Sequence, residues 1–112
     1  MSERSYLREL EQLALLSVLR LGEDAYGARI REDLQQTARR PVSIATIYVA
    51  LSRLEQHGLV RSWMSDPTPV RGGKSKKYYE LRPDGVQALK EAKATLERMW
   101  QGIGEALGVR ST

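Results

Sequence analysis

The sequence contains no cysteine and a single histidine, His57. Without cysteine the chain has no disulfide bond, no thiol nucleophile and no thiolate-bound metal, which fits a reducing compartment. One histidine is too few for an ordinary histidine metal site or a histidine-based catalytic centre. Nor do the motifs pair a nucleophile with a base. We therefore expect no enzymatic activity, no metal and no cofactor.

Long apolar runs are missing as well, so no segment is expected to span a bilayer, and the N-terminus does not resemble a signal peptide. A cytoplasmic protein with no membrane partner is the expectation. The 112 residues, 41% of them hydrophobic and 29% charged, have an ordinary soluble composition. The net charge of +4 and the pI of about 9.6 favour a polyanionic partner such as nucleic acid, although so small an excess is weak evidence alone.

The segment Pro41–Val60 predicts an amphipathic helix that begins after the N-cap Ser43 and ends at Gly58. Its apolar residues, spaced along one helical stripe, are Ile44, Ile47, Leu51 and Leu54. The other face carries small and hydroxyl side chains near its start and a cation further along: Ser43, Ala45, Thr46, Val49, Ser52 and Arg53. Small side chains let a helix approach the floor of the DNA major groove. An ordinary core helix would show the same apolar stripe.

Two further helices are expected before this one. The first covers Tyr6–Leu21, and its residues 13–16 and 18–19 are apolar nearly all round, which suggests contact with another subunit as well as with the core. After Gly22, Asp24 is the predicted N-cap of a helix that runs to about Gln36. A polar turn, residues 37–42, then joins that helix to the next, and such a pair predicts a helix-turn-helix.

Residues 59–65 and 77–81 alternate as strands do, and the proline- and glycine-rich segment between them predicts a long hairpin tip. The hairpin carries the cations Arg71, Lys74, Lys76 and Lys77, for which we expect contact with phosphates. Lysines also protect edge strands, which is the alternative reading. For Trp63 we expect a place in the core. The text GGKS is not a phosphate-binding P-loop, because Thr68 stands where its first glycine is required.

Pro83 opens a last helix that is predicted to reach about Leu107. Its residues repeat as the two core rows of a heptad: Val86, Lys93, Trp100 and Leu107 in one row, and Leu89, Leu96 and Ile103 in the other. Lys93 is costly in such a row, and we expect it either to set the register or to lie where the helices diverge. The expected partner of this seam is the same helix of a second copy. The alternative is that the helix folds back onto its own domain.

The predicted order of elements is that of a winged helix-turn-helix with a dimerisation helix, and the sequence resembles the PadR family of bacterial transcriptional regulators. The resemblance, to short members with a single C-terminal helix, spans roughly residues 7–107. The matching motifs are Tyr26-Gly27, Thr46-Ile47-Tyr48, Leu51 with Arg53-Leu54-Glu55, Gly58-Leu59-Val60, Arg71-Gly72-Gly73, Lys77-Tyr78-Tyr79-Glu80-Leu81 and Gly85. The family's recognition helix usually reads Gly-Thr-Ile-Tyr-Pro, whereas this chain has Ala45 and Val49 at the outer positions, so no operator sequence is transferred.

The resemblance implies an α+β, mostly helical fold, with a winged helix-turn-helix over residues 1–82 and a C-terminal dimerisation helix and tail over residues 83–112. It also implies a homodimeric repressor of a pseudo-palindromic operator in double-stranded DNA. Base edges are assigned to Ser43, Thr46 and Val49, and the DNA backbone to Tyr26, Arg39, Tyr48, Arg53, Arg71, Lys74 and Lys76. For Tyr48 the alternative is that it packs partly against the preceding helix. The dimer contacts are assigned to Leu89, Leu96, Trp100, Ile103 and Leu107.

Trp100 raises a further expectation, since short family members can hold flat aromatic ligands between paired tryptophans. A small aromatic effector is therefore a partner to test, although a tryptophan in a seam is also ordinary interface packing. Two other functions compete with DNA binding. A protein-contact winged helix predicts an acidic or apolar recognition face, which this sequence does not have. A small-molecule-binding protein with little DNA binding remains open through Trp100.

Overall fold

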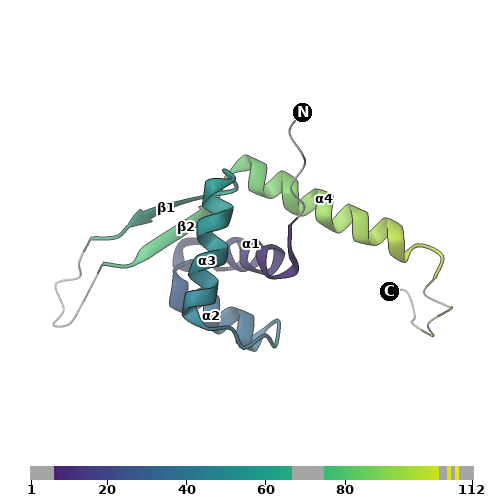
Figure 1. Ribbon diagram of the computed structural model, residues 1–112, viewed down its shortest axis with the longest axis horizontal. Helices are drawn as coiled ribbons and strands as arrows, with labels where there is room; N and C mark the ends of the chain where they lie inside the picture. Colours follow the sequence, from purple (N-terminus) through teal and green to yellow (C-terminus); the bar gives the residue numbers. More distant parts are fainter. Residues whose placement is uncertain (1–6, 67–74, 104–105, 107, 109–112) are drawn as a thin grey trace.

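The computed structural model describes residues 7–66, 75–103, 106 and 108 of the chain. Within these ranges the elements follow in the order α1 (Glu9–Leu21), the 3-10 helix η1 (Gly22–Asp24), α2 (Gly27–Gln36), α3 (Ile44–Gln56), β1 (Val60–Met64), β2 (Lys77–Leu81) and α4 (Pro83–Trp100). The first three α-helices form a central body, from which the β1–β2 hairpin extends to one side and α4 to the other (Figure 1). This is the mostly helical winged helix-turn-helix that the sequence predicted.

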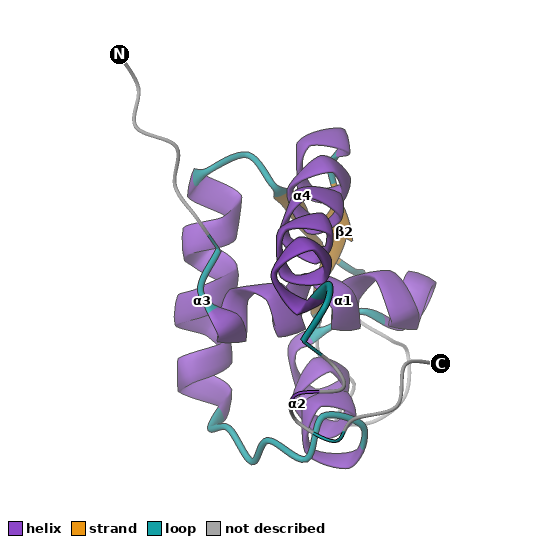
Figure 2. Cartoon of the chain, turned by 90° about the vertical axis from the view of Figure 1, so that its right-hand side faces the viewer, coloured by secondary structure: helices purple, strands orange, loops and turns teal. Residues whose placement is uncertain are grey.

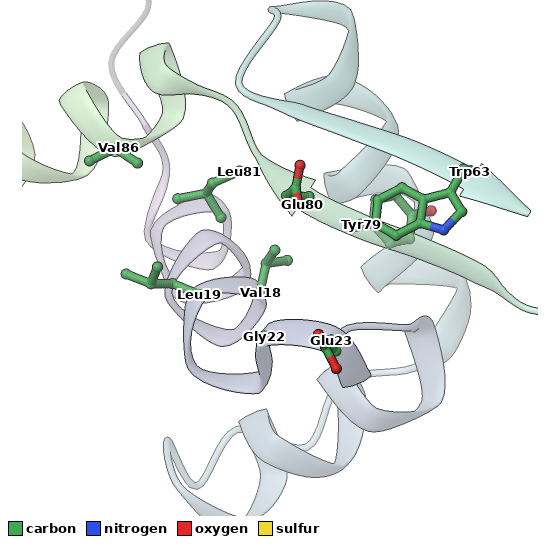
Figure 3. A pocket seen from close by; sticks show the side chains of 9 residues that line it. All are labelled: Val18, Leu19, Gly22, Glu23, Trp63, Tyr79, Glu80, Leu81 and Val86. Atoms are coloured by element: carbon green, nitrogen blue, oxygen red, sulfur yellow. The ribbon is translucent and has the colours of Figure 1, made fainter. Parts of the chain in front are cut away.

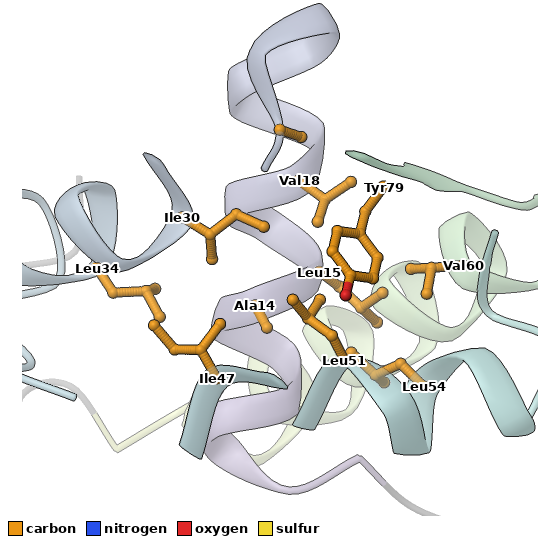
Figure 4. Close-up of a cluster of buried hydrophobic side chains, with 11 residues drawn as sticks. Ala14, Leu15, Val18, Ile30, Leu34, Ile47, Leu51, Leu54, Val60 and Tyr79 are labelled. Atoms are coloured by element: carbon orange, nitrogen blue, oxygen red, sulfur yellow. The ribbon is translucent and has the colours of Figure 1, made fainter. Parts of the chain in front are cut away.

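Helix α1 runs across the body and packs against α2, α3 and α4 (Figure 2). The buried side chains of the body and the hairpin form one core, drawn in Figure 4: Ala14, Leu15, Val18, Ala25, Ile30, Leu34, Ile47, Leu51, Leu54, Val60 and Tyr79. The stripe predicted for α3 is buried at Ile47, Leu51 and Leu54 and half-buried at Ile44. Since the core takes this stripe, the opposite face of α3 is left outside.

Helix α3 begins and ends as its local sequence predicts. The Ser43 side-chain oxygen accepts a hydrogen bond from the Thr46 backbone N–H at 3.1 Å, which satisfies a donor that the first helical turn leaves free. At the other end Gly58 has a φ of 74°, a left-handed conformation that costs glycine little. Both the predicted cap and the predicted stop are confirmed.

The start of α2 differs from the prediction. Asp24 is not the N-cap, because it lies in η1, and the N-cap is Tyr26, whose side chain makes no capping hydrogen bond. The cause is a long-range contact: the Ala25 carbonyl accepts a hydrogen bond from the Tyr79 N–H of β2 at 2.9 Å. This pairing holds the chain extended between η1 and α2, so the helix starts later than Asp24. Helix α1 also starts later than predicted, at Glu9.

The hairpin strands pair antiparallel, with Ser62 opposite Tyr79 and Trp63 opposite Tyr78. Because side chains alternate along a strand, Ser62 and Tyr79 share the face toward the body. Tyr79 is buried there, and burial, with smaller contributions from Tyr48 and Glu55, raises its pKa to about 12. The Ser62 hydroxyl donates to the Glu55 carboxylate of α3 at 2.7 Å, which joins the hairpin to the candidate recognition helix.

The predicted core position of Trp63 is wrong, since its side chain is 39% exposed. Trp63 lies on the hairpin face that points away from the core, where its ring stacks on that of Tyr78 with centroids 6.1 Å apart. The Arg61 guanidinium lies over the Trp63 ring at 4.6 Å from its centroid. The hairpin residues that do lie in the core are Val60 and Tyr79, on the other face.

Pro83 occupies the first turn of α4 as predicted, but the helix ends at Trp100 and not near Leu107. Gln101 has an extended backbone, so Ile103 lies beyond the helix, and Leu107 lies outside the described residues. The heptad therefore holds only as far as Trp100. Leu89, assigned to the dimer seam, packs partly against the core of its own chain. In the described residues no helix has the length and apolar character to cross a membrane.

Asp33 of α2 is the centre of a polar cluster that ties α2 to α1. Its carboxylate accepts hydrogen bonds from the Ser17 hydroxyl at 2.9 Å, from the Arg20 guanidinium at 3.2 and 3.3 Å, and from the Thr37 hydroxyl at 2.9 Å. Burial by itself raises the pKa of Asp33. The hydrogen bonds from Arg20, Ser17 and Thr37, with the positive charge of Arg20, outweigh burial and hold the pKa below its usual value of 3.8.

The lowered pKa predicts an acid-sensitive contribution to stability. Stabilisation by the Asp33 carboxylate is present above the unfolded-state pKa and is lost as the pH falls through the lower folded-state pKa. At neutral pH, Asp33→Asn should lower the free energy of unfolding by about 1.5–3 kcal/mol, the range for hydrogen bonds to a charged group. Urea unfolding measured from pH 7 to pH 3 should show that the difference in the free energy of unfolding between the wild type and Asp33→Asn becomes smaller as the pH falls.

Asp24→Asn is the matched control, because Asp24 is exposed and its side chain has no hydrogen bond or ion pair within the described residues. It should change the free energy of unfolding by less than about 0.5 kcal/mol. A constant difference between the wild type and Asp33→Asn across the whole pH range would contradict the role assigned to the carboxylate.

Candidate nucleic-acid interface

The outward face of α3 is made of small and uncharged side chains. Ser43, Ala45, Thr46, Val49 and Ser52 are all exposed, and Val49 is 71% exposed, an unusual position for an aliphatic side chain. The Ser43 and Thr46 hydroxyls lie 2.9 Å apart in addition to the capping bond, so the first turn is internally organised. A face of this kind offers hydroxyl groups and methyl groups to a partner, and both are used in reading base edges.

Tyr48 lies beside this face and packs against the beginning of α2. A methyl group at Gly27 would overlap the Tyr48 hydroxyl and the adjoining ring atoms, so glycine is required for this close approach. The sequence had left two roles open for Tyr48, a phosphate contact and packing against the preceding helix. Its side chain is partly exposed and partly packed, so the hydroxyl is held at a defined place at the edge of α3.

The hairpin and the start of α2 meet at the same place. Tyr26 forms an antiparallel backbone bridge with Tyr78, and the two rings contact edge to face with centroids 5.4 Å apart. The Lys76 ammonium lies over the Tyr26 ring at 4.3 Å from its centroid. A lysine from the hairpin and two tyrosines from the helices, Tyr26 and Tyr48, are thus brought together although they are far apart in the sequence.

These residues line a hollow of about 400 Å³, which we call the wing–helix cleft: Tyr26, Gly27, Ala28, Tyr48, Met64, Ser75, Lys76 and Lys77. Its polar groups are tyrosine and serine hydroxyls, lysine ammonium groups and the backbone at the uncapped start of α2. Nearly all are hydrogen-bond donors, as a phosphate requires. Sequence reasoning assigned Tyr26, Tyr48 and Lys76 to the DNA backbone, but it missed Ala28, Met64 and Ser75, because their only signal is their place in the fold.

Arg39 is exposed in the turn between α2 and α3, and its φ of 56° lies in the left-handed region that non-glycine residues rarely adopt. The Arg40 N–H donates to the Leu34 carbonyl at 2.9 Å and closes this turn around Arg39. Arg40 itself forms an ion pair with Glu9 at 2.8 Å. The fold therefore holds Arg39 at the corner of the helix-turn-helix, beside the start of α3.

Arg53, predicted to contact the DNA backbone, has a partner within the protein. Its guanidinium Nε lies 2.7 Å from the carboxylate of Glu11, which is only 5% exposed and also accepts the Arg8 N–H. A buried carboxylate that lost this cation would be left with an uncompensated charge. The ion pair gives Arg53 a structural role, and its predicted contact with the DNA backbone stays a prediction. Arg71 and Lys74 lie outside the described residues.

Among the described residues, none of those assigned to the dimer seam belongs to the outward face of α3 or to the wing–helix cleft. Leu96 and Trp100 lie on the part of α4 that extends away from the body (Figure 1). Met99 and Trp100 are 72% and 51% exposed, and Ile103 is exposed just past the helix. On α1, Leu16 and Leu19 are also exposed. Large apolar residues that the core leaves uncovered thus lie on α1 and α4, as well as on the hairpin (Trp63 and Met64) and on the outward face of α3.

The comparisons with known proteins agree with this geometry. The model of the transcriptional regulator PadR-like family matches residues 15–91, which extend from α1 into α4. No curated protein sequence gives a match. Among solved structures, the chain is similar to PadR family regulators from Clostridium difficile R20291 (27% identity, 86% of this chain and 98% of that chain, TM-score 0.68) and Eggerthella lenta DSM 2243 (29% identity, 91% and 88%, TM-score 0.68).

A PadR-like transcription factor from Bacteroides fragilis is similar as well (28% identity, 87% of this chain and 88% of that chain, TM-score 0.69). The chain spans nearly the whole length of all three relatives, so the likeness is not limited to the helix-turn-helix. The family consists of transcription regulators and not of enzymes, as the sequence led us to expect. The chain belongs to the PadR-like family of DNA-binding transcriptional regulators.

Proposed function

We propose that this regulator is a homodimeric repressor that binds a pseudo-palindromic operator and is released by a small effector. The observation that carries the proposal is the outward face of α3, uncharged and rich in hydroxyl and methyl groups, next to a cleft lined by lysines and tyrosines. In the proposed mode of binding, Ser43, Thr46 and Val49 contact base edges in the major groove. Tyr26, Tyr48 and Lys76 hold a phosphate of the DNA backbone in the wing–helix cleft.

Two features support this division of roles. The α3 face has no carboxylate among its outward residues between Ser43 and Ser52, so nothing there repels a phosphate backbone. Val49 is suited to a thymine methyl group, because burying an apolar side chain that is now in water is favourable. Arg39 in the turn, with Arg71 and Lys74 of the hairpin, adds candidate backbone contacts that are independent of base sequence.

A second copy of the chain is the partner that best accounts for α4. Its outer part exposes Leu96, Met99 and Trp100, a concentration of apolar surface that monomers rarely leave in water. In a two-fold dimer the same patch serves both copies, and the α1 residues Leu16 and Leu19 add to it. Two recognition helices would then be spaced about 34 Å apart, one turn of DNA. Release by an effector follows the family resemblance and the exposure of Trp100.

DNA binding is tested first by a gel shift with the DNA upstream of the protein's own gene, with competitor DNA and across a range of salt concentrations. A discrete complex is expected. In Lys76→Ala, the slope of log K against log salt should flatten by about one, because one phosphate contact is lost. Lys90→Ala, which removes the same charge from the exposed surface of α4, is the control and should leave the slope unchanged.

No complex with that DNA, together with none from a random-sequence selection pool, would contradict the proposed function. An equal change of slope in Lys76→Ala and Lys90→Ala would retain DNA binding and remove the wing–helix cleft from it.

The dimer is tested by Leu96→Glu, which places a charge on the exposed apolar surface of α4. Sedimentation should show monomers, since a carboxylate without a partner is costly to bury in an apolar seam. Thr95→Glu is the matched control, because Thr95 is exposed on the same turn but outside both heptad rows. If Leu96→Glu still forms a dimer as stable as that of Thr95→Glu, the contact between copies lies elsewhere.

Two substitutions of Arg39 test its effect on stability separately from its effect on DNA binding. Arg39→Gly should raise the free energy of unfolding by about 0.5–1 kcal/mol, because relief of about 1–2 kcal/mol of left-handed strain exceeds the entropic cost of glycine. Arg39→Ala keeps the strain and should give no such gain. Both variants should weaken DNA binding to a similar extent, as measured by gel shift. Equal stability of the two variants would show that the left-handed backbone of Arg39 costs nothing.

A further inference from the structure

The outward face of α3 lacks the side chains that distinguish bases by hydrogen bonds. In the major groove, guanine and adenine are read by bidentate contacts from arginine, lysine, asparagine or glutamine, and cytosine is read by a carboxylate. None of these residue types occurs between Ser43 and Ser52. Arg53 follows this stretch, but its guanidinium is held by the buried Glu11 carboxylate. Gln56 lies in the last turn of α3, whereas the N-terminal residues of a recognition helix contact the bases.

The two hydroxyl groups of the first turn are bonded to each other. The Ser43 oxygen accepts the Thr46 N–H at 3.1 Å, and the two side-chain oxygens lie 2.9 Å apart, so one of the two hydroxyl protons is used within the protein. One hydroxyl donor remains for a base. Because a hydroxyl both donates and accepts, it pairs with base edges of either kind. The Ser43–Thr46 pair therefore adds contact with DNA without choosing among the bases.

Val49 supplies the apolar chemistry of this face. Its side chain is 71% exposed and lies one turn after the exposed Ala45, so the two form an apolar row. Apart from Tyr48 at the edge of the face, the large apolar side chains that are exposed among the described residues lie outside α3. Leu19 and Trp63, for example, line a hollow between α1, the hairpin and α4 (Figure 3). In the major groove, the hydrocarbon group that a base offers to such a row is the C5 methyl of thymine.

We propose that Val49 is the specificity-determining residue of α3 and that it selects a pyrimidine by its C5 methyl group. Resting on the proposed function, we assign this contact to the same outward face of α3. Thymine and 5-methylcytosine present the methyl group at the same place in the major groove, and uracil and cytosine lack it. Since no side chain of this face reads the hydrogen-bonding edge beside the methyl group, 5-methylcytosine replaces thymine at the contacted position. Methylation of a cytosine at that position therefore raises the affinity of the regulator for its DNA.

The test starts from the operator that the gel shift identifies. Single thymines are replaced by deoxyuridine, which removes the C5 methyl group and keeps the hydrogen-bonding edge. At the thymine that Val49 contacts, replacement in one half-site should weaken binding about three- to fivefold, the effect of one buried methyl group. The same T·A pair is then changed to C·G and to 5-methylcytosine·G. The methylated pair should bind more tightly than the unmethylated pair by the same factor.

Two variants separate a contact of Val49 from an effect of the substituted base on DNA shape. Val49→Ala removes two methyl groups from an exposed side chain, and it should fold normally, because alanine favours a helix. It should bind the thymine and uracil operators with nearly equal affinity. Lys76→Ala is the matched control, because a phosphate contact does not depend on the base. It should weaken both complexes and keep the three- to fivefold preference for thymine that the wild type shows.

Three results would overturn the inference. Equal affinity of the wild type for the thymine and uracil operators at every position would mean that no methyl group is read. A preference for thymine that persists in Val49→Ala would belong to DNA shape or to another side chain. A loss with uracil that 5-methylcytosine does not restore would mean that the carbonyl edge of thymine is read as well.

Failure of the proposed function gives a different result, because the unsubstituted operator then forms no complex. A normal complex that is indifferent to the methyl groups overturns only the role of Val49.

Discussion

The attachment of the hairpin to the helical body depends on a backbone hydrogen bond, from the Tyr79 N–H to the Ala25 carbonyl at 2.9 Å. Both groups are buried, and a buried backbone donor or acceptor without a partner is costly, so the bond is strongly favoured once Tyr79 enters the core. It also decides where α2 begins, because the chain stays non-helical at Ala25 and Tyr26. The wing–helix cleft lies beside this junction.

The two faces of the hairpin carry different chemistry because strand side chains alternate. On the face toward the body, Ser62 binds Glu55 of α3, and Tyr79 fills the core. On the other face, Trp63 stacks on Tyr78, and Arg61 pairs with Glu80. The two strands, of five residues each, therefore contact α3 with one face and present an aromatic pair and an ion pair on the other. In the proposed mechanism, the hairpin contacts DNA through the wing–helix cleft.

Internal ion pairs and hydrogen bonds hold the helices together and use none of the residues on the outward face of α3. Arg53 neutralises the buried Glu11, which ties α3 to the start of α1, and Arg20 with Ser17 and Thr37 satisfies Asp33, which ties α2 to α1. The outward face of α3 needs none of these contacts, so its small side chains remain free for a partner. The outer part of α4 is different, because its apolar residues have no partner within the described chain, and a second copy is what we propose for them.

Local sequence determined much of this protein. The Ser43 cap, the Gly58 stop, the Pro83 start and the apolar stripe of α3 act through neighbours a few residues away, and each is where the sequence predicted it. The order of elements was also readable, as was membership of the family. The outward face of α3 followed from the stripe, since a helix that buries one side exposes the other.

Tertiary structure decided what depends on partners distant in the sequence. The N-cap of α2 is Tyr26 and not Asp24, because β2 pairs with Ala25. Trp63 is exposed because it lies on the hairpin face opposite to Val60 and Tyr79, which are in the core. Arg53 forms an ion pair with the buried Glu11, which lies 42 positions earlier in the sequence, and periodicity gives no signal for such a contact. The wing–helix cleft arises in the same way, from residues of α2, α3 and the hairpin. The spacing of residues predicts which face of a helix or strand each side chain occupies, but only tertiary packing determines what that face contacts.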